Sequence, residues 1–361
     1  MSSISMRRIS AFILLAFFIG FSANLRAELV WTPGDGWRIK GGAFSGLVGA
    51  DARNALELMN KARAAEERGS KRSALRAYKK VTNAYPNSIY APEASFCIGH
   101  LRLANRQYYK AFEAFQKIMT RYPNSDRFNE VLGQQFEIAT SLMNGARNYL
   151  WGWLPSFKNR ERAITYFEWV IASAPYSDYA PLALMNVART HQRLKNTPYA
   201  IDALDRLINN YYQSLLAPDA YLQLAQSHAS LVDGPNYDQE STREAITYFQ
   251  DFMILFSEDS GLSDAQEGLN DMKTVFAESK MVLGDYYLKY RKNYQGARVF
   301  YNEAITDFPN SAVADRARSQ LEIVDAREAA LVISSKIDEN GDPINLEKTA
   351  PQPRKKFLGI F

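Results

Sequence analysis

The sequence is poor in the residue types that most often carry catalysis or bind metals. Its 361 residues include one cysteine, Cys97, and three histidines, at positions 100, 191 and 228. One cysteine excludes an intrachain disulfide. No two histidines lie three or four positions apart, so a zinc signature is missing. There is also no glycine-rich phosphate loop and no Gly-x-Ser-x-Gly turn. We therefore expect no metal, no cofactor and no catalytic site.

A large excess of charge of either sign is missing as well. The chain has 43 basic and 39 acidic residues, a net charge of +4. Arg7, Arg8 and Arg26 fall in the N-terminal segment described below, and without them 40 basic residues face 39 acidic ones, a net charge of +1. A nearly neutral chain has no electrostatic basis for binding nucleic acid. The partners we expect are proteins.

Long apolar runs are confined to the start of the chain. Two arginines precede an apolar segment over residues 11–21, and Leu25-Arg26-Ala27 suits a cleavage site. This pattern predicts a signal peptide over residues 1–27. The apolar segment is shorter than the roughly 20 residues needed to span a bilayer, and the alternative interpretation is an uncleaved anchor. Cleavage would leave an exported, periplasmic chain.

The dominant feature of the sequence is an internal repeat. Tyr-Pro-Asn-Ser occurs at 85–88 and 122–125, Phe-Pro-Asn-Ser occurs at 308–311, and weaker copies stand at 174–177, 211–214 and 256–259. A small residue lies twelve positions before each proline or its substitute: Ala74, Ala111, Ala163, Ala200, Ala245 and Ala297. A recurring spacing of this kind is typical of a solenoid built from stacked units.

Each unit predicts a helical hairpin. In the second copy, apolar residues fall at helical spacing over 92–104 and again over 109–119. Gly99 and Ala111 place small residues where the two helices would cross, and Pro123 cannot continue the second helix. A single hairpin has too little core, so it must stack on its neighbours. We predict an all-α superhelix of about six hairpins over residues 51–334, ending in a C-terminal capping helix.

Two segments flank the predicted repeats. Residues 28–50 are rich in glycine and include Trp31 and Trp37. We expect an extended arm without regular structure that lays its two tryptophans on the first repeat. Residues 335–361 contain three prolines and few apolar positions, which predicts a disordered tail.

The third hairpin is interrupted by an aromatic loop. Residues 148–155 read Asn-Tyr-Leu-Trp-Gly-Trp-Leu-Pro, whereas connections between paired helices are normally short and polar. Trp151 and Trp153 either fold back to fill the inner surface of the solenoid or protrude toward a partner or a membrane. We expect burial, because two bare tryptophans on a loop tip would promote self-association.

The first helices of stacked hairpins line the concave face, where a segment of a partner would bind. The inward positions, counted from the small residue of each unit, mix methionine, phenylalanine and arginine, as peptide-binding grooves tend to do. The alternative is that several of them pack against the aromatic loop. The candidate partner-binding residues are Leu56, Met59, Arg63, Glu93, Phe96, His100, Leu182, Met185 and Arg189, together with Trp151 and Trp153.

The repeat unit resembles the tetratricopeptide repeat. Gly99, Ala111, Phe115 and Pro123 show the small, small, aromatic and proline pattern of that motif. More narrowly, the chain is similar to the BamD (YfiO) family, the tetratricopeptide component of the outer-membrane β-barrel assembly machinery. The opening hairpin, the aromatic loop of the third hairpin and the long first helix of the last unit carry this resemblance, which implies a right-handed superhelix.

The chain departs from this family in one respect. Members are lipoproteins acylated on a cysteine directly after the signal peptide, whereas the single cysteine here is Cys97. We expect no lipid anchor by that route, so that membrane association would come only through partners. The chain also has a sixth repeat where the family has five.

The resemblance implies a non-enzymatic scaffold of outer-membrane protein assembly, located in the periplasm or at the periplasmic face of the outer membrane. Its partners would be other proteins of the assembly complex and unfolded segments of outer-membrane proteins. The alternative is a generic exported tetratricopeptide adaptor in cell-envelope, cell-division or polysaccharide-export complexes. The missing acylated cysteine and the extra repeat favour that alternative.

Overall fold

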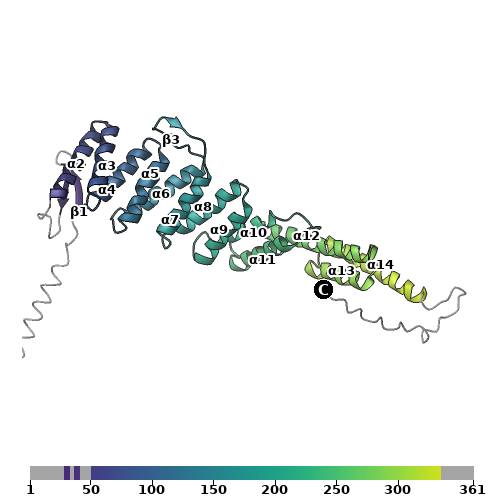
Figure 1. Cartoon of the computed structure of the whole chain (residues 1–361). Coiled ribbons are helices and arrows are strands. Elements are labelled where there is room, and N and C mark those ends of the chain that lie inside the picture. The colour runs from purple at the N-terminus through teal and green to yellow at the C-terminus, as the bar shows by residue number, and fades with distance from the viewer. Residues whose placement is uncertain (1–27, 33–35, 41–49, 335–361) are drawn as a thin grey trace, which may run out of the picture. The chain divides into compact units, whose positions relative to one another are not determined.

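The predicted all-α architecture is confirmed. A computed structural model describes residues 28–32, 36–40 and 50–334, which form thirteen helices and two short β-hairpins (Figure 1). Counted along the sequence, the thirteen helices correspond to two helices for each of the six predicted units and one closing helix. The predicted signal peptide and C-terminal tail lie outside these residues. Within the described part of the chain, no helix combines the length and the apolar character that a membrane crossing requires.

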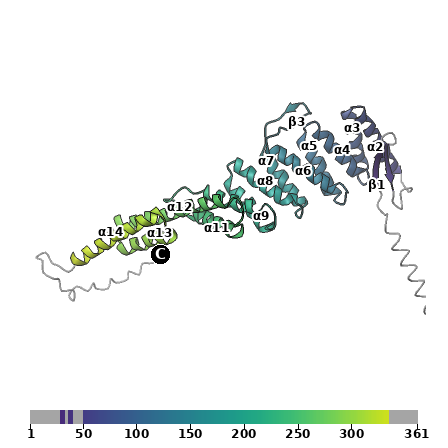
Figure 2. The same ribbon diagram turned by 180° about the vertical axis from the view of Figure 1, so that it is seen from behind.

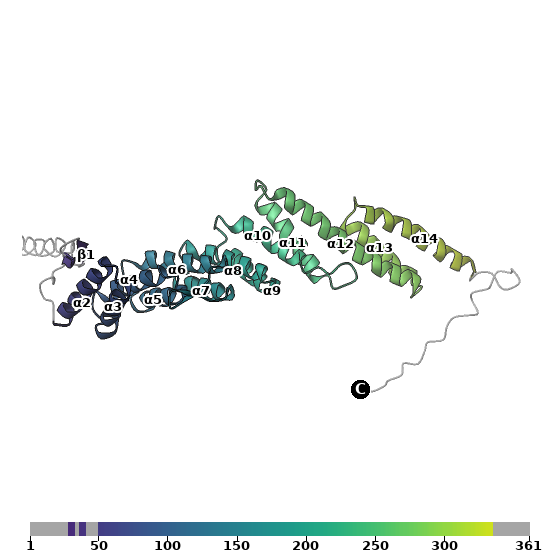
Figure 3. The ribbon, with the colours of Figure 1, turned by 90° about the horizontal axis from the view of Figure 1, so that it is seen from above.

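The chain divides into two compact units, Met1–Arg193 and Leu194–Phe361. Consecutive helices of the first unit pack against one another, and α6 also contacts α8. Seen from above, α4, α6 and α8 lie along one side of this unit and α5 and α7 along the other (Figure 3). The helices are α2 (Ala50–Glu67), α3 (Lys71–Ala84), α4 (Ala91–Leu103), α5 (Tyr108–Arg121), α6 (Phe128–Met143), α7 (Glu161–Ser173) and α8 (Tyr179–Arg193).

The second unit is organised around its longest helix. Helix α12 has 28 residues and packs against α10, α11, α13 and α14. Helix α14 is the predicted closing helix. The helices of this unit are α9 (Thr197–Asn210), α10 (Ala217–Ala229), α11 (Glu240–Leu255), α12 (Leu262–Lys289), α13 (Tyr294–Asp307) and α14 (Ala312–Ser334).

The repeated Tyr-Pro-Asn-Ser phrase ends the second helix of a pair and links neighbouring pairs. The backbone N–H of Tyr85 donates to the carbonyl of Val81, and that of Tyr122 donates to Ile118, so each tyrosine closes the last helical turn. The following proline prevents a further turn. The hydroxyl of Tyr122 then donates to the carbonyl of Pro86 at 2.6 Å. This bond joins the turn after the second hairpin to the turn after the first.

Small residues bring paired helices close together, as their spacing predicts. Ala74, Ala111 and Ala163 are fully buried. Gly99 on α4 lies directly against the ring of Phe115 on α5, and a Cβ at this position would overlap that ring. The close approach therefore depends on a residue without a side chain.

Residues 28–50 correct one prediction. They contain a β-hairpin, β1 (Glu28–Thr32) paired antiparallel with β2 (Gly36–Lys40), instead of an arm without regular structure. The backbone N–H of Trp37 donates to Oδ1 of Asn60 at 2.8 Å. Gly36 has φ +79°, and a Cβ there would lie 2.7 Å from the same oxygen, so glycine is required. The expected packing of Trp31 and Trp37 on the first helix pair is confirmed.

The aromatic loop corrects a second prediction. Residues 149–155 form a hairpin of two short strands, β3 (Tyr149–Leu150) and β4 (Leu154–Pro155), that lies against the turn between α4 and α5 (Figure 2). Trp151 is 71% exposed and Trp153 is 69% exposed. The predicted burial of these tryptophans is wrong. Gly152, which lies between them, faces Asn105 of the turn between α4 and α5, while both indole rings remain mostly in solvent.

Candidate partner-binding groove

The first two helix pairs and the β1–β2 hairpin enclose a groove of 610 Å³. We call it the N-terminal groove. The first helices of the pairs, α2 and α4, supply one wall, the start of α6 closes one side, and the β-hairpin covers another. Its lining residues are Val30, Trp31, Trp37, Arg63, Glu66, Glu93, Phe96, Cys97, His100, Arg127 and Glu130.

Aromatic rings and guanidinium groups form the contact surface of the groove. Phe96 is nearly buried, and its ring lies 4.3 Å from that of His100, centre to centre. The guanidinium of Arg127 lies over the ring of Phe96, and that of Arg63 lies over Trp31, each at 4.2 Å from the ring centre. Such stacking holds each arginine over an aromatic ring, so that charged groups and apolar surface alternate along the wall.

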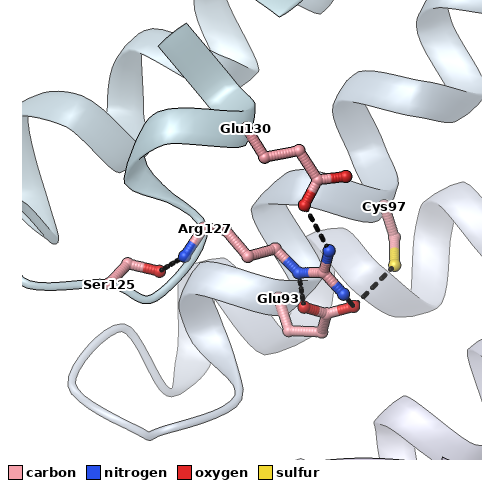
Figure 4. A network of polar contacts seen from close by, with 5 residues as sticks. All are labelled: Glu93, Cys97, Ser125, Arg127 and Glu130. Carbon is pink, nitrogen blue, oxygen red and sulfur yellow. Dashed lines mark hydrogen bonds and ion pairs between the residues drawn. The ribbon is translucent and has the colours of Figure 1, made fainter. Parts of the chain in front are cut away.

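An ion-pair network holds Arg127 in place (Figure 4). Its Nε donates to Glu93 at 2.5 Å, and its Nη1 donates to Glu130 at 2.6 Å. Burial alone would lower the pKa of Arg127, but the hydrogen bonds and charges of the two glutamates outweigh burial and raise it. The side chain of Glu93 is only 12% exposed. This pair is therefore a fixed part of the wall.

Cys97 lies next to this network, and its thiol is expected to be unreactive. Its thiol points to Glu93 (Figure 4), with Sγ 3.9 Å from Oε1. Burial, aided by the charge of Glu93, raises the pKa of the thiol to about 12. Because the thiolate is the reactive form, this cysteine is inert at neutral pH. Nearby, the hydroxyl of Tyr78 donates to Glu66 at 3.0 Å, which fixes a second carboxylate of the wall.

Three potential donors on the wall have no hydrogen-bond acceptor among the described residues. They are Nε1 of Trp37, Nε of Arg63 and Nε2 of His100. Nε of Arg63 lies 3.8 Å from Oε1 of Glu67, which is too long for a hydrogen bond. Buried polar groups are normally satisfied. All three nitrogens are themselves buried, so a bound chain could accept from them only if the side chains of the wall moved.

The groove unites four of the predicted site residues, Arg63, Glu93, Phe96 and His100. Two others belong to the core of the first helix pair: Met59 is fully buried, and Leu56 packs against that core. The prediction that Met59 faces a partner is therefore wrong, whereas Leu56 is only partly buried and its contact with a partner stays a prediction. A fixed offset from the small residue of each unit does not distinguish positions that face the groove from positions that pack between helices.

The remaining predicted residues lie elsewhere. Met185 on α8 is buried, whereas Leu182 and Arg189 on the same helix are exposed outside the groove. Trp151 and Trp153 are at the tip of the β3–β4 hairpin. None of these five contributes to the N-terminal groove.

Sequence reasoning missed several wall residues. Trp31 and Trp37 had been placed on the first repeat but not in a site, and Arg127 and Glu130 had not been considered. The available indication was the Arg-x-x-Glu spacing that begins one residue after Asn124-Ser125, which puts both side chains at the start of α6. The described residues contain no group of three or more His, Cys, Asp or Glu side chains that could hold a metal ion.

His100 gives the groove a pH dependence. Burial lowers the pKa of its imidazole below the ordinary value of 6.5. The positive charge of Arg127 acts in the same direction, and the negative charges of Glu130, Glu93 and Glu66 oppose it. The neutral imidazole is therefore the form that the folded protein favours.

We expect the first unit to lose stability as the pH falls through 6.5 toward the folded-state pKa of His100. In that window the unfolded chain binds a proton that the folded protein does not, so unfolding gains from acid. His100→Gln should flatten this part of the profile. Urea unfolding of the first unit at about pH 7.5 and about pH 5.5 measures it. An equal slope in His100→Gln and the parent would contradict the assignment.

Comparisons with known proteins agree with this architecture. The family model YfiO, described as an outer membrane lipoprotein, matches residues 156–339, and a tetratricopeptide repeat model matches residues 58–88 and 98–125. The outer membrane protein assembly factor BamD of Caulobacter vibrioides is 24% identical over 131 residues. That match covers 36% of this chain and 43% of the relative, so the chain matches less than half of the relative's length.

Two solved structures are also similar. A repeat protein from Parabacteroides merdae is 13% identical, with a TM-score of 0.30, and the match covers 75% of this chain and 99% of that one. MamA from Desulfovibrio magneticus is 17% identical, with a TM-score of 0.29, and the match covers 59% of this chain and 99% of that one. The YfiO match extends over half of the present sequence, and the described helices have the paired arrangement that its repeats predict. The chain belongs to the YfiO family of outer membrane lipoproteins.

Proposed function

We propose that this protein is a periplasm-facing, non-enzymatic scaffold of outer-membrane protein assembly. In this proposal the N-terminal groove binds a segment of a partner protein, either a component of the assembly complex or an unfolded outer-membrane protein. Membership of the YfiO family and the similarity to BamD support the assembly role. The groove supports the binding role.

The observation that carries the proposal is the pairing of an apolar surface with unsatisfied polar groups. Phe96 and Trp31 give the groove an apolar lining beneath the guanidinium groups of Arg127 and Arg63, while Trp37, Arg63 and His100 hold buried polar nitrogens without acceptors. The three glutamates and two arginines of the wall give a formal charge of −1 with His100 neutral. A nearly balanced wall favours recognition by shape and hydrogen bonding over attraction to a strongly charged ligand.

Arg63→Ala tests the groove. We expect it to weaken partner binding at least about tenfold, since hot-spot arginines typically contribute about 2 kcal/mol or more and 1.4 kcal/mol is about a factor of ten. Affinity isolation from solubilised membranes, with the recovered proteins quantified, provides the measurement. Arg76→Ala is the matched control, because Arg76 is exposed on α3 and donates only to a carbonyl of its own helix.

Two outcomes would contradict the proposal. Equal recovery with Arg63→Ala and Arg76→Ala would show that the groove is not the binding surface. Recovery of division or polysaccharide-export proteins in place of a β-barrel assembly component would assign the chain to the alternative adaptor role. A thermal unfolding curve for each variant ensures that lost binding is not lost folding.

A further inference from the structure

We propose that the β3–β4 hairpin is a membrane-docking element, which inserts its tryptophan tip into the interface of a phospholipid bilayer with anionic headgroups. This inference goes beyond the proposed function, because it adds a lipid-binding site to a protein-binding scaffold. It also departs from the expectation that membrane association comes only through partners. It rests on residues 147–160, which lie apart from the N-terminal groove.

The hairpin is held firmly at its base. The backbone N–H of Tyr149 donates to the carbonyl of Arg106 at 2.9 Å, and that of Ser156 donates to the carbonyl of Asn148 at 2.8 Å. The buried side chain of Asn148 accepts from the N–H of Tyr109 at 3.2 Å. The loop is thus fixed to the turn between α4 and α5. Because the base is fixed, the tip can insert into a bilayer without the entropic cost of ordering a flexible loop.

The tip is apolar and open to solvent. Besides the two tryptophans, Leu150 is 44% exposed and Leu154 is 38% exposed, and the two leucines are directly paired across the strands. Phe157, just beyond the second strand, is 95% exposed. Trp151 has φ +52°, a conformation that a bulky residue rarely adopts. The fold therefore tolerates local strain in order to present this side chain at the turn.

The charges around the tip match an anionic surface. Residues 147–160 contain three basic residues, Arg147, Lys158 and Arg160, and no acidic residue. Arg147 and Lys158 are exposed at the two ends of the hairpin, and neither forms an ion pair with another described residue. Basic side chains bordering tryptophan, leucine and phenylalanine are typical of segments that lie in the headgroup region of a membrane.

The size of the tip favours a bilayer over a protein partner. Specific protein interfaces typically involve about 20–30 residues on each side, whereas the exposed apolar surface here comes from a few side chains at the end of one hairpin. A bilayer interface sets no such minimum, and tryptophan is enriched at that depth because its ring is apolar and its N–H is polar.

Vesicle flotation tests the proposal. The protein is recovered from the cell envelope, so that its N-terminus is the one the cell leaves, and is mixed with vesicles of phosphatidylethanolamine and phosphatidylglycerol. We expect the parent to float with the vesicles and to lose tryptophan fluorescence when brominated lipids are included. Trp151→Ser combined with Trp153→Ser should lower the vesicle-bound fraction at least about tenfold and remove most of the quenching.

Two further variants separate the contributions of charge and apolar surface. Arg147→Glu combined with Lys158→Glu should weaken binding to the anionic vesicles and leave weak binding to pure phosphatidylcholine unchanged. Tyr176→Ser, which removes a fully exposed aromatic ring from the turn before α8, is the control and should bind like the parent. Thermal unfolding should be the same for all variants, because none of the altered side chains is buried.

Several results would overturn the proposal. One is a parent protein that does not float with anionic vesicles. Another is a double tryptophan variant that floats as well as the parent. A third is a double variant that keeps its vesicle binding but loses a protein in affinity isolation, which would assign the tip to a protein contact. The Arg63→Ala variant of the groove should bind vesicles normally, so failure of one proposal is distinguishable from failure of the other.

Discussion

Replacing Phe112 by alanine is expected to lower the free energy of unfolding of the first unit by about 3–5 kcal/mol, the usual cost of removing a large buried aromatic side chain. Phe112 lies on α5 and is fully buried. Its ring stacks on Tyr166 of α7 with 3.7 Å between ring centres, and the ring of Trp169 lies 5.7 Å away. This cluster joins the second helix pair to the third.

The cost should be large because of where the cavity would form. In a solenoid each pair contacts only its neighbours, so stability is close to a sum of pair and interface contributions. Loss of the Phe112 ring removes much of one interface, and the rings of Tyr166 and Trp169 cannot collapse into the space without moving α7. We expect the first unit to unfold in more than one step in the variant, because its two sides become less coupled.

Chemical denaturation followed by circular dichroism and by tryptophan fluorescence measures this effect. Phe157→Ala is the matched control, since it removes the same side chain from the same unit at a position that is 95% exposed. We expect that control to unfold like the parent. Loss of less than about 1 kcal/mol in Phe112→Ala would mean that the site collapses freely, and the interface would then not depend on the ring stack.

The helical repeat was predictable because its determinants are local and recur. Pro86 and Pro123 end helices by chemistry that does not depend on the rest of the fold, and Ala74 and Ala111 mark crossings through their lack of bulk. With several copies of one pattern, an error in any single copy does not change the assignment. The number of helix pairs and the closing helix could therefore be derived before any contact was known.

The two β-hairpins were not predictable, because their determinants are neither local nor repeated. Each occurs once, and each depends on a contact with a distant segment: Asn60 accepts from Trp37, and the carbonyl of Arg106 accepts from Tyr149. Glycine content suggested an irregular arm, whereas Gly36 is needed for the turn geometry and the approach to Asn60. Hydrophobicity suggested burial of the loop tip, whereas both of its tryptophans are mostly exposed.

Only part of the lining of the N-terminal groove could be predicted from the sequence. Helical periodicity placed Arg63, Phe96 and His100 on one face, but it could not reveal that Trp37 covers that face from a separate strand. Met59 lies four positions before Arg63 on the same helix but is fully buried in the core. The first helix of a pair is buried by its neighbouring helices as well as lining the groove, and the spacing does not distinguish the two faces. Local pattern indicates which side of a helix is apolar but not which neighbour covers it.

A substitution at Gly99, where α4 and α5 cross, is expected to have the second large effect on the free energy of unfolding. Gly99→Val should destabilise the first unit by about 3 kcal/mol, at the upper end of the usual 1–3 kcal/mol cost of overpacking. An added Cβ would overlap the ring of Phe115, which is itself fully buried and cannot swing away. Glycine inside a helix normally costs about 1 kcal/mol relative to alanine. Helix propensity alone would therefore make replacement of Gly99 stabilising. We predict a loss of stability instead, because the overlap with Phe115 costs more than helix propensity gains.

Gly133→Ala is the matched control, because Gly133 is also inside a helix of the same unit but faces only the hydroxyl of Tyr179, at 2.9 Å from the added Cβ. A small rotation of that ring relieves the contact, so we expect a change close to zero. The decisive measurement is a double-mutant cycle. Phe115→Ala alone should cost about 3–5 kcal/mol, yet Gly99→Val combined with Phe115→Ala should cost clearly less than the two single changes together, because the valine then fills the space that the ring leaves. Strictly additive free energies would show that the two side chains do not share this space, and the close crossing of α4 and α5 would need another cause.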